Sequence, residues 1–156
     1  MHGRPRKPLN PGNGDEDSFQ KSTQLRTLQS QLLHNHHNKI YTKEALDLCS
    51  KLLEINPEFN TAWNYRKLVV QHHLSSQTNQ DFITSILDQE LKIVEIALEK
   101  NCKSYGSWHH RKWILNKGLS SLDHEFSLLN KFQEADSRNF HAWDYRRFVA
   151  ALKNVP

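Results

Sequence analysis

Three short phrases built around tryptophan recur along the chain, and they restrict its possible folds more than any other feature. They read NTAWNYR at 60–66, YGSWHHR at 105–111 and FHAWDYR at 140–146. In each phrase a small residue precedes the tryptophan and an arginine follows it by three positions. Successive tryptophans are 45 and 35 residues apart. Repeats of this length are typical of arrays of stacked helical hairpins.

Apolar residues between the phrases recur at helical spacing and do not alternate as they would in strands. We therefore predict an all-α fold, a right-handed α-α superhelix of about seven helices. Residues 1–17, rich in proline and glycine, are expected to form a disordered tail. The remaining residues, 18–156, are expected to form the helical-repeat domain. Its first helix precedes three repeats at about 42–76, 81–118 and 120–153.

Helix ends can be assigned from polar and glycine residues that flank the apolar stripes. Thr42 and Ser104 are expected to be N-caps, and Ser120 with Asp123 suggests a capping box for the helix that follows. Gly118 suits the left-handed position that ends a helix.

Composition excludes several classes of protein. A net charge of +4, with 24% charged residues of both signs, indicates solvated helix faces and no nucleic-acid partner. No stretch is apolar enough to span a membrane, and no targeting segment is evident, so we expect a cytoplasmic protein. Cys49 and Cys102 are expected to be reduced, with Cys49 in the core. The spacing of His34, His36 and His37 does not predict a metal site.

The residues that the three phrases share are expected to hold the repeats together. Tryptophan at one repeated structural position is what packing between adjacent hairpins requires. A repeated arginine can bind carbonyl groups at the C-terminus of a neighbouring helix or a buried acid. These structural residues are Trp63, Arg66, Trp108, Arg111, Trp143 and Arg146.

The residues that differ between repeats point to a function. Lys103 and Tyr105 lie in the turn entering the second repeat, and Asn139 and His141 lie in the turn entering the third. On consecutive hairpins these turns share one edge of the array, near helix N-termini. Such an edge suits an anionic ligand such as a diphosphate. The same residues could equally be solvated turn residues.

At these phrases the sequence resembles the repeats of protein prenyltransferase alpha subunits. The resemblance covers roughly residues 18–152. Gly106 lies where farnesyl and type I enzymes have glutamine, so the resemblance is greatest to alpha subunits of type II (Rab) geranylgeranyltransferases. It implies a crescent of helical hairpins that wraps a beta subunit. The beta subunit would carry the zinc ion, and the two subunits together would act as a transferase.

The resemblance also implies roles for particular residues. Lys103 would reach the isoprenoid diphosphate, with Tyr105 and His141 as further catalytic residues of the same cleft. Asn139 would lie beside them in the substrate-binding set. The chain would bind no cofactor or metal itself, although His2 could visit the zinc of the partner.

The implied partners are a prenyltransferase beta subunit, geranylgeranyl diphosphate and a Rab GTPase presented by an escort protein. Because alpha subunits of this family have more repeats, we expect a chain shortened at its C-terminus and inactive alone. Two alternatives remain open: a non-catalytic, tetratricopeptide-like interaction scaffold, and the alpha subunit of farnesyl or type I enzymes.

Overall fold

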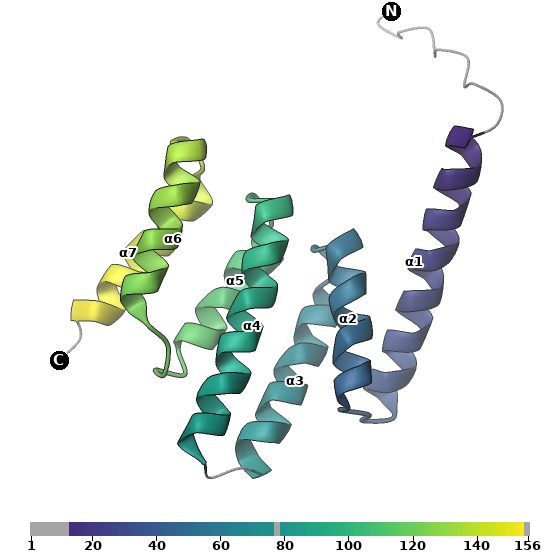
Figure 1. The fold of residues 1–156 in the computed structure, drawn as a ribbon, viewed down its shortest axis with the longest axis horizontal. Coiled ribbons are helices and arrows are strands. Elements are labelled where there is room, and N and C mark those ends of the chain that lie inside the picture. The colour runs from purple at the N-terminus through teal and green to yellow at the C-terminus, as the bar shows by residue number, and fades with distance from the viewer. Residues whose placement is uncertain (1–12, 77–78, 155–156) are drawn as a thin grey trace, which may run out of the picture.

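Seven α-helices and no strand make up the residues that the computed structural model describes, 13–76 and 79–154. Figure 1 shows α1 at one end of a row, followed by the hairpins α2–α3, α4–α5 and α6–α7. The prediction of an all-α fold of stacked hairpins is confirmed. None of the described helices is long and apolar enough to cross a membrane. Their bounds are α1 Asn13–His37, α2 Lys43–Ile55, α3 Asn60–Ser76, α4 Gln80–Lys100, α5 Tyr105–Leu115, α6 Leu122–Ala135 and α7 Phe140–Asn154.

Most helix ends fall where short polar residues predict them. Thr42 Oγ1 accepts a hydrogen bond from the backbone N–H of Ala45, and Ser104 Oγ accepts one from that of Ser107, both at 3.2 Å. Gly118 adopts a φ of +79°, which confirms its left-handed position after α5.

The predicted capping box at Ser120 is wrong by one residue. Ser121 is the N-cap of α6, and its hydroxyl accepts the N–H of His124 at 3.3 Å. Ser121 is the last residue with extended backbone before the helix, so only its side chain can reach that donor. Asp123 instead forms an exposed ion pair with Lys153 at 3.1 Å.

The first helix begins earlier than expected. It starts at Asn13, so residues 13–17 belong to α1 and not to the predicted tail. Glu16 and Asp17 place negative charge near the positive end of the helix dipole, which favours helix there. Residues 1–12, with the rest of the predicted tail and His2, lie outside the described part of the chain.

One continuous core runs through all three hairpins. Cys49 is fully buried in it, and burial raises the pKa of its thiol to about 11, so the thiol is inert as predicted. Ile55, Leu68 and Phe82 are among the apolar residues that recur at helical spacing, but they are exposed. Ile55 and Phe82 lie at helix ends. Leu68 cannot share one narrow stripe with the two valines that follow it.

The indole of each repeated tryptophan holds the preceding turn against its helix. Trp63 Nε1 donates to the carbonyl of Pro57 at 2.7 Å, six residues earlier. Trp108 and Trp143 make the same bond at 2.8 Å to the carbonyls of Cys102 and Ser137. All three tryptophans therefore set the geometry of their turns, and Trp63 and Trp108 also fill the core.

A buried ion pair joins each hairpin to the next one. Arg66 of α3 donates from Nε and Nη2 to Glu90 of α4, at 3.0 and 2.7 Å. Arg111 of α5 binds Glu125 of α6 in the same way, at 2.6 Å for both bonds. All four side chains are almost completely buried. The expectation of a buried acid is confirmed for these two arginines.

The remaining nitrogen of each arginine binds its own hairpin. Nη1 of Arg66 donates to the carbonyl of Leu46 at 3.1 Å, and Nη1 of Arg111 donates to that of Leu91 at 3.0 Å. Leu46 lies near the start of α2 and Leu91 in the middle of α4, so the expected bonding to carbonyls at a helix C-terminus is wrong. The arginines tie the two helices of one hairpin to the first helix of the next.

Each buried glutamate also binds the residue before the arginine in the following phrase. Glu90 contacts Nε2 of His110 at 3.0 Å, and Glu125 accepts a hydrogen bond from the hydroxyl of Tyr145 at 2.6 Å. Burial alone would raise the pKa of Glu90. The charge of Arg66 and the hydrogen bonds from His110 and Arg66 outweigh that effect and hold the pKa at about 2.

The third phrase departs from this pattern. Trp143 is 44% exposed, whereas Trp63 and Trp108 are 2% and 3% exposed. The expectation that Trp143 lies in the core is therefore wrong. In the first two repeats the next hairpin covers the tryptophan, because Trp63 packs against His110 of α5 and Trp108 against Tyr145 of α7. Among the described residues no later helix covers Trp143 in this way.

This difference predicts unequal costs for the same substitution. Trp108→Ala should lower the free energy of unfolding by about 3–5 kcal/mol, because it empties a buried site and removes the bond to the Cys102 carbonyl. Trp143→Ala should cost about half of that or less. Urea unfolding followed by circular dichroism measures both, and equal losses would contradict the packing described above.

The low pKa of Glu90 predicts a specific dependence of stability on pH. Because its folded pKa lies below the ordinary value of 4.5, its contribution is complete above that pH and is lost as the pH falls toward 2. The contribution is on the order of 3 kcal/mol. Glu90→Gln should therefore be less stable than the parent at pH 7, and the gap should close toward pH 2. Glu99→Gln, at an exposed site, is the control and should follow the parent chain at every pH.

Candidate ligand-binding face

A column of cations runs along α3, α5 and α7, one helical turn after each repeated tryptophan. Lys67, Lys112 and Arg147 each follow their tryptophan by four positions. In an α-helix this spacing places the cation and the tryptophan on the same face. Because the three helices occupy equivalent places in consecutive hairpins, we call the surface they share the α3/α5/α7 face.

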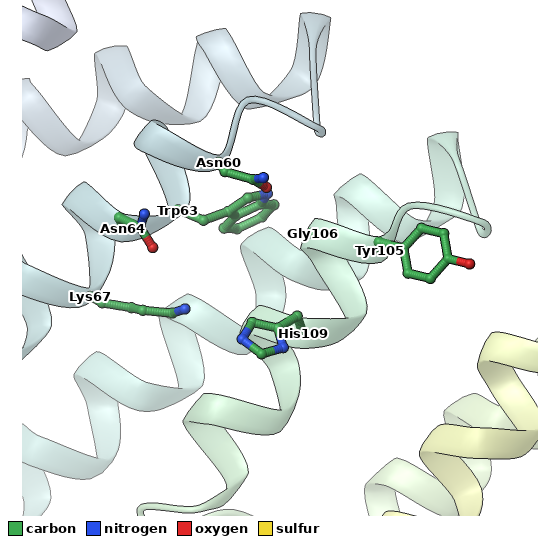
Figure 2. A pocket seen from close by; sticks show the side chains of 7 residues that line it. All are labelled: Asn60, Trp63, Asn64, Lys67, Tyr105, Gly106 and His109. Carbon is green, nitrogen blue, oxygen red and sulfur yellow. The ribbon is translucent and has the colours of Figure 1, made fainter.

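The first cavity on this face lies between α3 and α5 and has a volume of about 390 Å³. Figure 2 shows Lys67 and His109 pointing toward one another across it, with the indole of Trp63 at one side. Burial and the charges of Lys67 and Lys112 lower the pKa of His109. His109 is therefore neutral at pH 7 and can accept or donate one hydrogen bond. The lining residues are Asn60, Trp63, Asn64, Lys67, Tyr105, Gly106 and His109.

A second cavity of about 320 Å³ lies between α5 and α7. Tyr105 and His109 line both cavities, so the two hollows adjoin. Lys112 forms an ion pair with Asp144 at 2.7 Å, whereas Arg147 carries no ion pair within the described residues. The cavity thus combines aromatic walls with cationic groups. It is lined by Tyr105, Trp108, His109, Lys112, Phe140, His141, Trp143, Asp144 and Arg147.

Tyr105 and His141, which the sequence placed on consecutive turns, lie in contact. Their ring centroids are 4.2 Å apart in an edge-on arrangement, and Phe140 packs beside His141 at 4.0 Å. Tyr105 is exposed and His141 is buried. Burial and the nearby charge of Lys103 lower the pKa of His141, against the opposite effects of Asp144 and Glu58. Its imidazole is therefore neutral at pH 7.

Lys103 and Asn139 occupy different positions from this pair. Lys103 is exposed and lines neither cavity, although its charge acts on His141. Asn139 is buried, and its amide nitrogen donates to the carbonyl of Cys102 at 2.9 Å. Its Oδ1 accepts the backbone N–H of His141 at 3.1 Å. Asn139 thus clamps the turn of the third hairpin to the turn of the second and orients the backbone at His141.

Gly106 allows α5 to approach the first hairpin closely. A Cβ at this position would lie 2.8 Å from Trp63 Nε1 and 2.9 Å from the carbonyl oxygen of Pro57. These two atoms form the hydrogen bond that holds the first turn. Any side chain at position 106 would therefore have to displace this bond, so glycine is required by packing as well as fitting the resemblance noted above.

Histidines outside this face do not converge on a metal site. Residues 13–76 and 79–154 contain no group of three His, Cys, Asp or Glu side chains that could hold a metal ion. His34 bonds to the amide of Asn38 at 3.2 Å, and His36 packs against Tyr65.

Sequence reasoning missed the cation column and the two buried glutamates. The cations could have been found, because extending each phrase by one residue adds a lysine or arginine every time. Glu90 and Glu125 also carry a signal, since each lies on an apolar stripe of its helix where an unpaired charge would be costly. Their partners on another hairpin could not be read from local spacing.

The fold and these junctions define a class, the proteins built from stacked helical hairpins with repeated tryptophan and arginine. The sequence model described as "Protein prenyltransferase alpha subunit repeat" matches residues 42–73, 87–118 and 122–152. These matches cover more than half of the chain. The chain therefore belongs to the family of protein prenyltransferase alpha subunit repeats.

Similar proteins carry one consistent name. The chain is 49% identical to "Geranylgeranyl transferase type-2 subunit alpha 2" of Arabidopsis thaliana, over 97% of this chain and 24% of that protein. It is 58% identical to subunit alpha 1 of the same plant, over 78% of this chain and 18% of that protein. It is 36% identical to "Geranylgeranyl transferase type-2 subunit alpha" of Rattus norvegicus, over 99% of this chain and 28% of that protein. The chain spans about a quarter of the length of these relatives.

The close approach at Gly106 predicts a local defect when a methyl group is added. Gly106→Ala should lower the free energy of unfolding by about 1–3 kcal/mol, because the clash involves a backbone carbonyl that cannot move aside freely. The indole resonance of Trp63 in a nuclear magnetic resonance spectrum should shift as its bond to Pro57 breaks. Gly118→Ala is the matched control. It has open space around the added atom but a positive φ, so it should cost about 1 kcal/mol and leave that resonance in place.

Proposed function

We propose that this chain forms part of the alpha subunit of a type II (Rab) geranylgeranyltransferase. The observation that carries the proposal is the identity of 49–58% with two proteins named as type-2 alpha subunits. The requirement for glycine at position 106 supports the same class. By the resemblance noted above, farnesyl and type I alpha subunits of the same family have glutamine there, and in this fold its side chain would collide with Trp63 and the Pro57 carbonyl.

The proposed reaction transfers a geranylgeranyl group to a cysteine near the C-terminus of a Rab GTPase, presented by an escort protein. The cysteine sulfur forms a bond to the first carbon of the isoprenoid. The bond from that carbon to the diphosphate oxygen breaks, and the diphosphate leaves with the electron pair. The zinc ion of a beta subunit would supply the activation of the cysteine thiol.

The residues of this chain would act on the diphosphate. Lys103 is exposed and forms no ion pair within the described residues, so its ammonium group is free to bind a phosphate oxygen. It would offset the charge that grows on the leaving diphosphate. Tyr105 and His141, which line the cavity between α5 and α7, would present a phenol hydroxyl and a neutral imidazole to the same ligand. Lys67 and Arg147 would make the surrounding potential positive and so raise the local concentration of an anionic substrate.

The α3/α5/α7 face would also contact the beta subunit. Three aromatic side chains, those of Tyr105, Phe140 and Trp143, are 65%, 61% and 44% exposed on it. Exposed aromatic residues grouped with arginine are typical of the residues that contribute most energy at protein interfaces. A partner seated on this face would bury them and close the two cavities from solvent.

One alternative belongs to a different class. A helical-repeat scaffold would bind a protein partner without taking part in chemistry, and it would have no requirement for Lys103, Tyr105 and His141. Co-expression with a prenyltransferase beta subunit separates the two functions. The enzyme hypothesis predicts a stable complex, and failure to co-purify would favour the scaffold.

The proposed role of Lys103 is tested by substitution in an assembled enzyme. This chain would replace the matching part of the Arabidopsis thaliana alpha 2 relative, and the chimera would be co-expressed with a beta subunit. Lys103→Ala should lower the turnover number on the order of 100-fold, because one electrostatic contact to the leaving group is lost. The affinity for the beta subunit, measured by titration calorimetry, should change little.

Lys131→Ala provides the control, because Lys131 is an exposed lysine on α6 whose one ion pair within the described part of the chain is with Glu99 at 3.4 Å. It should leave both turnover and assembly unchanged. If the turnover of Lys103→Ala equals that of the parent chimera, Lys103 does not act on the diphosphate.

A further inference from the structure

The turns that join the two helices of each hairpin share one backbone arrangement. In each turn the backbone N–H five residues before the tryptophan donates to the side-chain oxygen of an asparagine or aspartate two residues earlier. These bonds run from Glu58 to Asn56 at 3.3 Å, from Lys103 to Asn101 at 3.1 Å and from Arg138 to Asp136 at 3.0 Å. Glu58, Lys103 and Arg138 therefore occupy equivalent places in consecutive turns.

Neighbouring turns are bonded to one another through the residue that follows this place. Ser104 Oγ donates a hydrogen bond to Oε1 of Glu58, which belongs to the turn of the first hairpin. Asn139 of the third turn donates to the carbonyl of Cys102 at 2.9 Å. Cys102 and Ser104 are the two sequence neighbours of Lys103. The turn that carries Lys103 is thus bonded to a different hairpin on each side of that residue.

The hydroxyl of Ser104 depends on Glu58 as its acceptor. Ser104 is buried, and its oxygen accepts the backbone N–H of Ser107 at 3.2 Å and the hydroxyl of Ser107 at 2.9 Å. Its own hydrogen is donated to Glu58. A buried donor without an acceptor is unfavourable, so loss of the carboxylate would favour a shift of this turn toward solvent.

Glu58 lies near the proposed diphosphate site but carries the wrong charge to bind an anion. Burial lowers the pKa of His141, and the charge of Glu58 acts against that effect, so the carboxylate is close to this ring. Within residues 13–76 and 79–154 Glu58 forms no ion pair and does not neutralise Lys103. Any part that Glu58 takes in the reaction is therefore exerted through Ser104 and not by contact with the substrate.

We propose that Glu58 is a positioning residue for Lys103. Its carboxylate holds the hydroxyl of Ser104, and together with the bond from Asn139 to Cys102 it fixes where the Lys103 backbone lies along the array. The side chain of Lys103 is a flexible stem, so the backbone determines which positions its ammonium group can reach. Stabilisation of the leaving diphosphate requires that group at a defined distance. The inference rests on the function proposed above, because it concerns the position of Lys103 relative to that substrate.

The chimera with its beta subunit provides the kinetic test. Glu58→Ala should lower the turnover number on the order of 10-fold, because a displacement of about 1 Å is enough to weaken an oriented contact. The KM for geranylgeranyl diphosphate should change little. Glu58→Gln keeps an oxygen that can accept from Ser104 and should restore the turnover of the parent chimera. Glu54→Ala is the matched control, since Glu54 is an exposed glutamate of α2 paired with Lys100 at 3.5 Å, and it should match the parent.

A double substitution tests whether Glu58 acts through Lys103. In the Lys103→Ala background, Glu58→Ala should lower turnover no further, because the group that it positions is already absent. An equal additional loss in both backgrounds would contradict the proposal, since Glu58 would then act on the reaction independently of Lys103.

A measurement that needs no activity follows the turn itself. The backbone order parameter of Lys103, from nuclear magnetic relaxation of its amide nitrogen, should fall in Glu58→Ala and keep the parent value in Glu58→Gln. An unchanged order parameter in Glu58→Ala would show that the bond does not hold this turn, whatever the protein does.

The kinetic outcomes separate this inference from the proposed function. Loss of turnover in Lys103→Ala without any loss in Glu58→Ala would overturn the positioning role and leave the function standing. Equal losses in Glu58→Ala and Glu58→Gln would also overturn it, because the charge and not the hydrogen bond would then matter. Unchanged turnover in Lys103→Ala would instead overturn the proposed role of Lys103, and this inference with it.

Discussion

The stacking of this array depends on a buried ion pair that joins each hairpin to its successor. Arg66 with Glu90, and Arg111 with Glu125, are held by two hydrogen bonds each and are almost completely removed from water. Removing charges from water is costly, so such a pair is favourable only when its geometry is satisfied completely. A shift of one hairpin by a helical turn would separate the partners and leave two buried charges. The pairs therefore select one register.

That register also fixes the geometry of the α3/α5/α7 face. With α3 and α5 held at a fixed spacing, Gly106 fits against the indole of Trp63, and Trp63 in turn holds the turn at Pro57. The same repeated bond orients the turns at Cys102 and Ser137, beside which Tyr105 and His141 meet. The two cavities and the cation column of the α3/α5/α7 face are thus consequences of junctions that lie within the core.

Local features were predictable because their causes are local. Thr42 and Ser104 cap helices through atoms three residues away, and Cys49 lies on a stripe whose period is visible in the sequence. Ser120 was assigned in error because two adjacent serines offer equivalent side chains and only the backbone conformation distinguishes them. The roles of Glu90 and Asn139 were not foreseen, since their partners lie 24 and 37 residues away on another hairpin.

The sequence by itself determined that this chain is a row of helical hairpins with a tryptophan and an arginine at each repeat. Spacing, capping residues and apolar stripes act within a few turns of helix, so they can be recognised in the sequence alone. Only the tertiary structure decided that three similar phrases have different environments. The following hairpin buries Trp108 and pairs Arg111 with a glutamate, whereas Trp143 is partly exposed and Arg146 has no such glutamate among the described residues. Burial and ion pairing depend on which residues lie across a junction between hairpins.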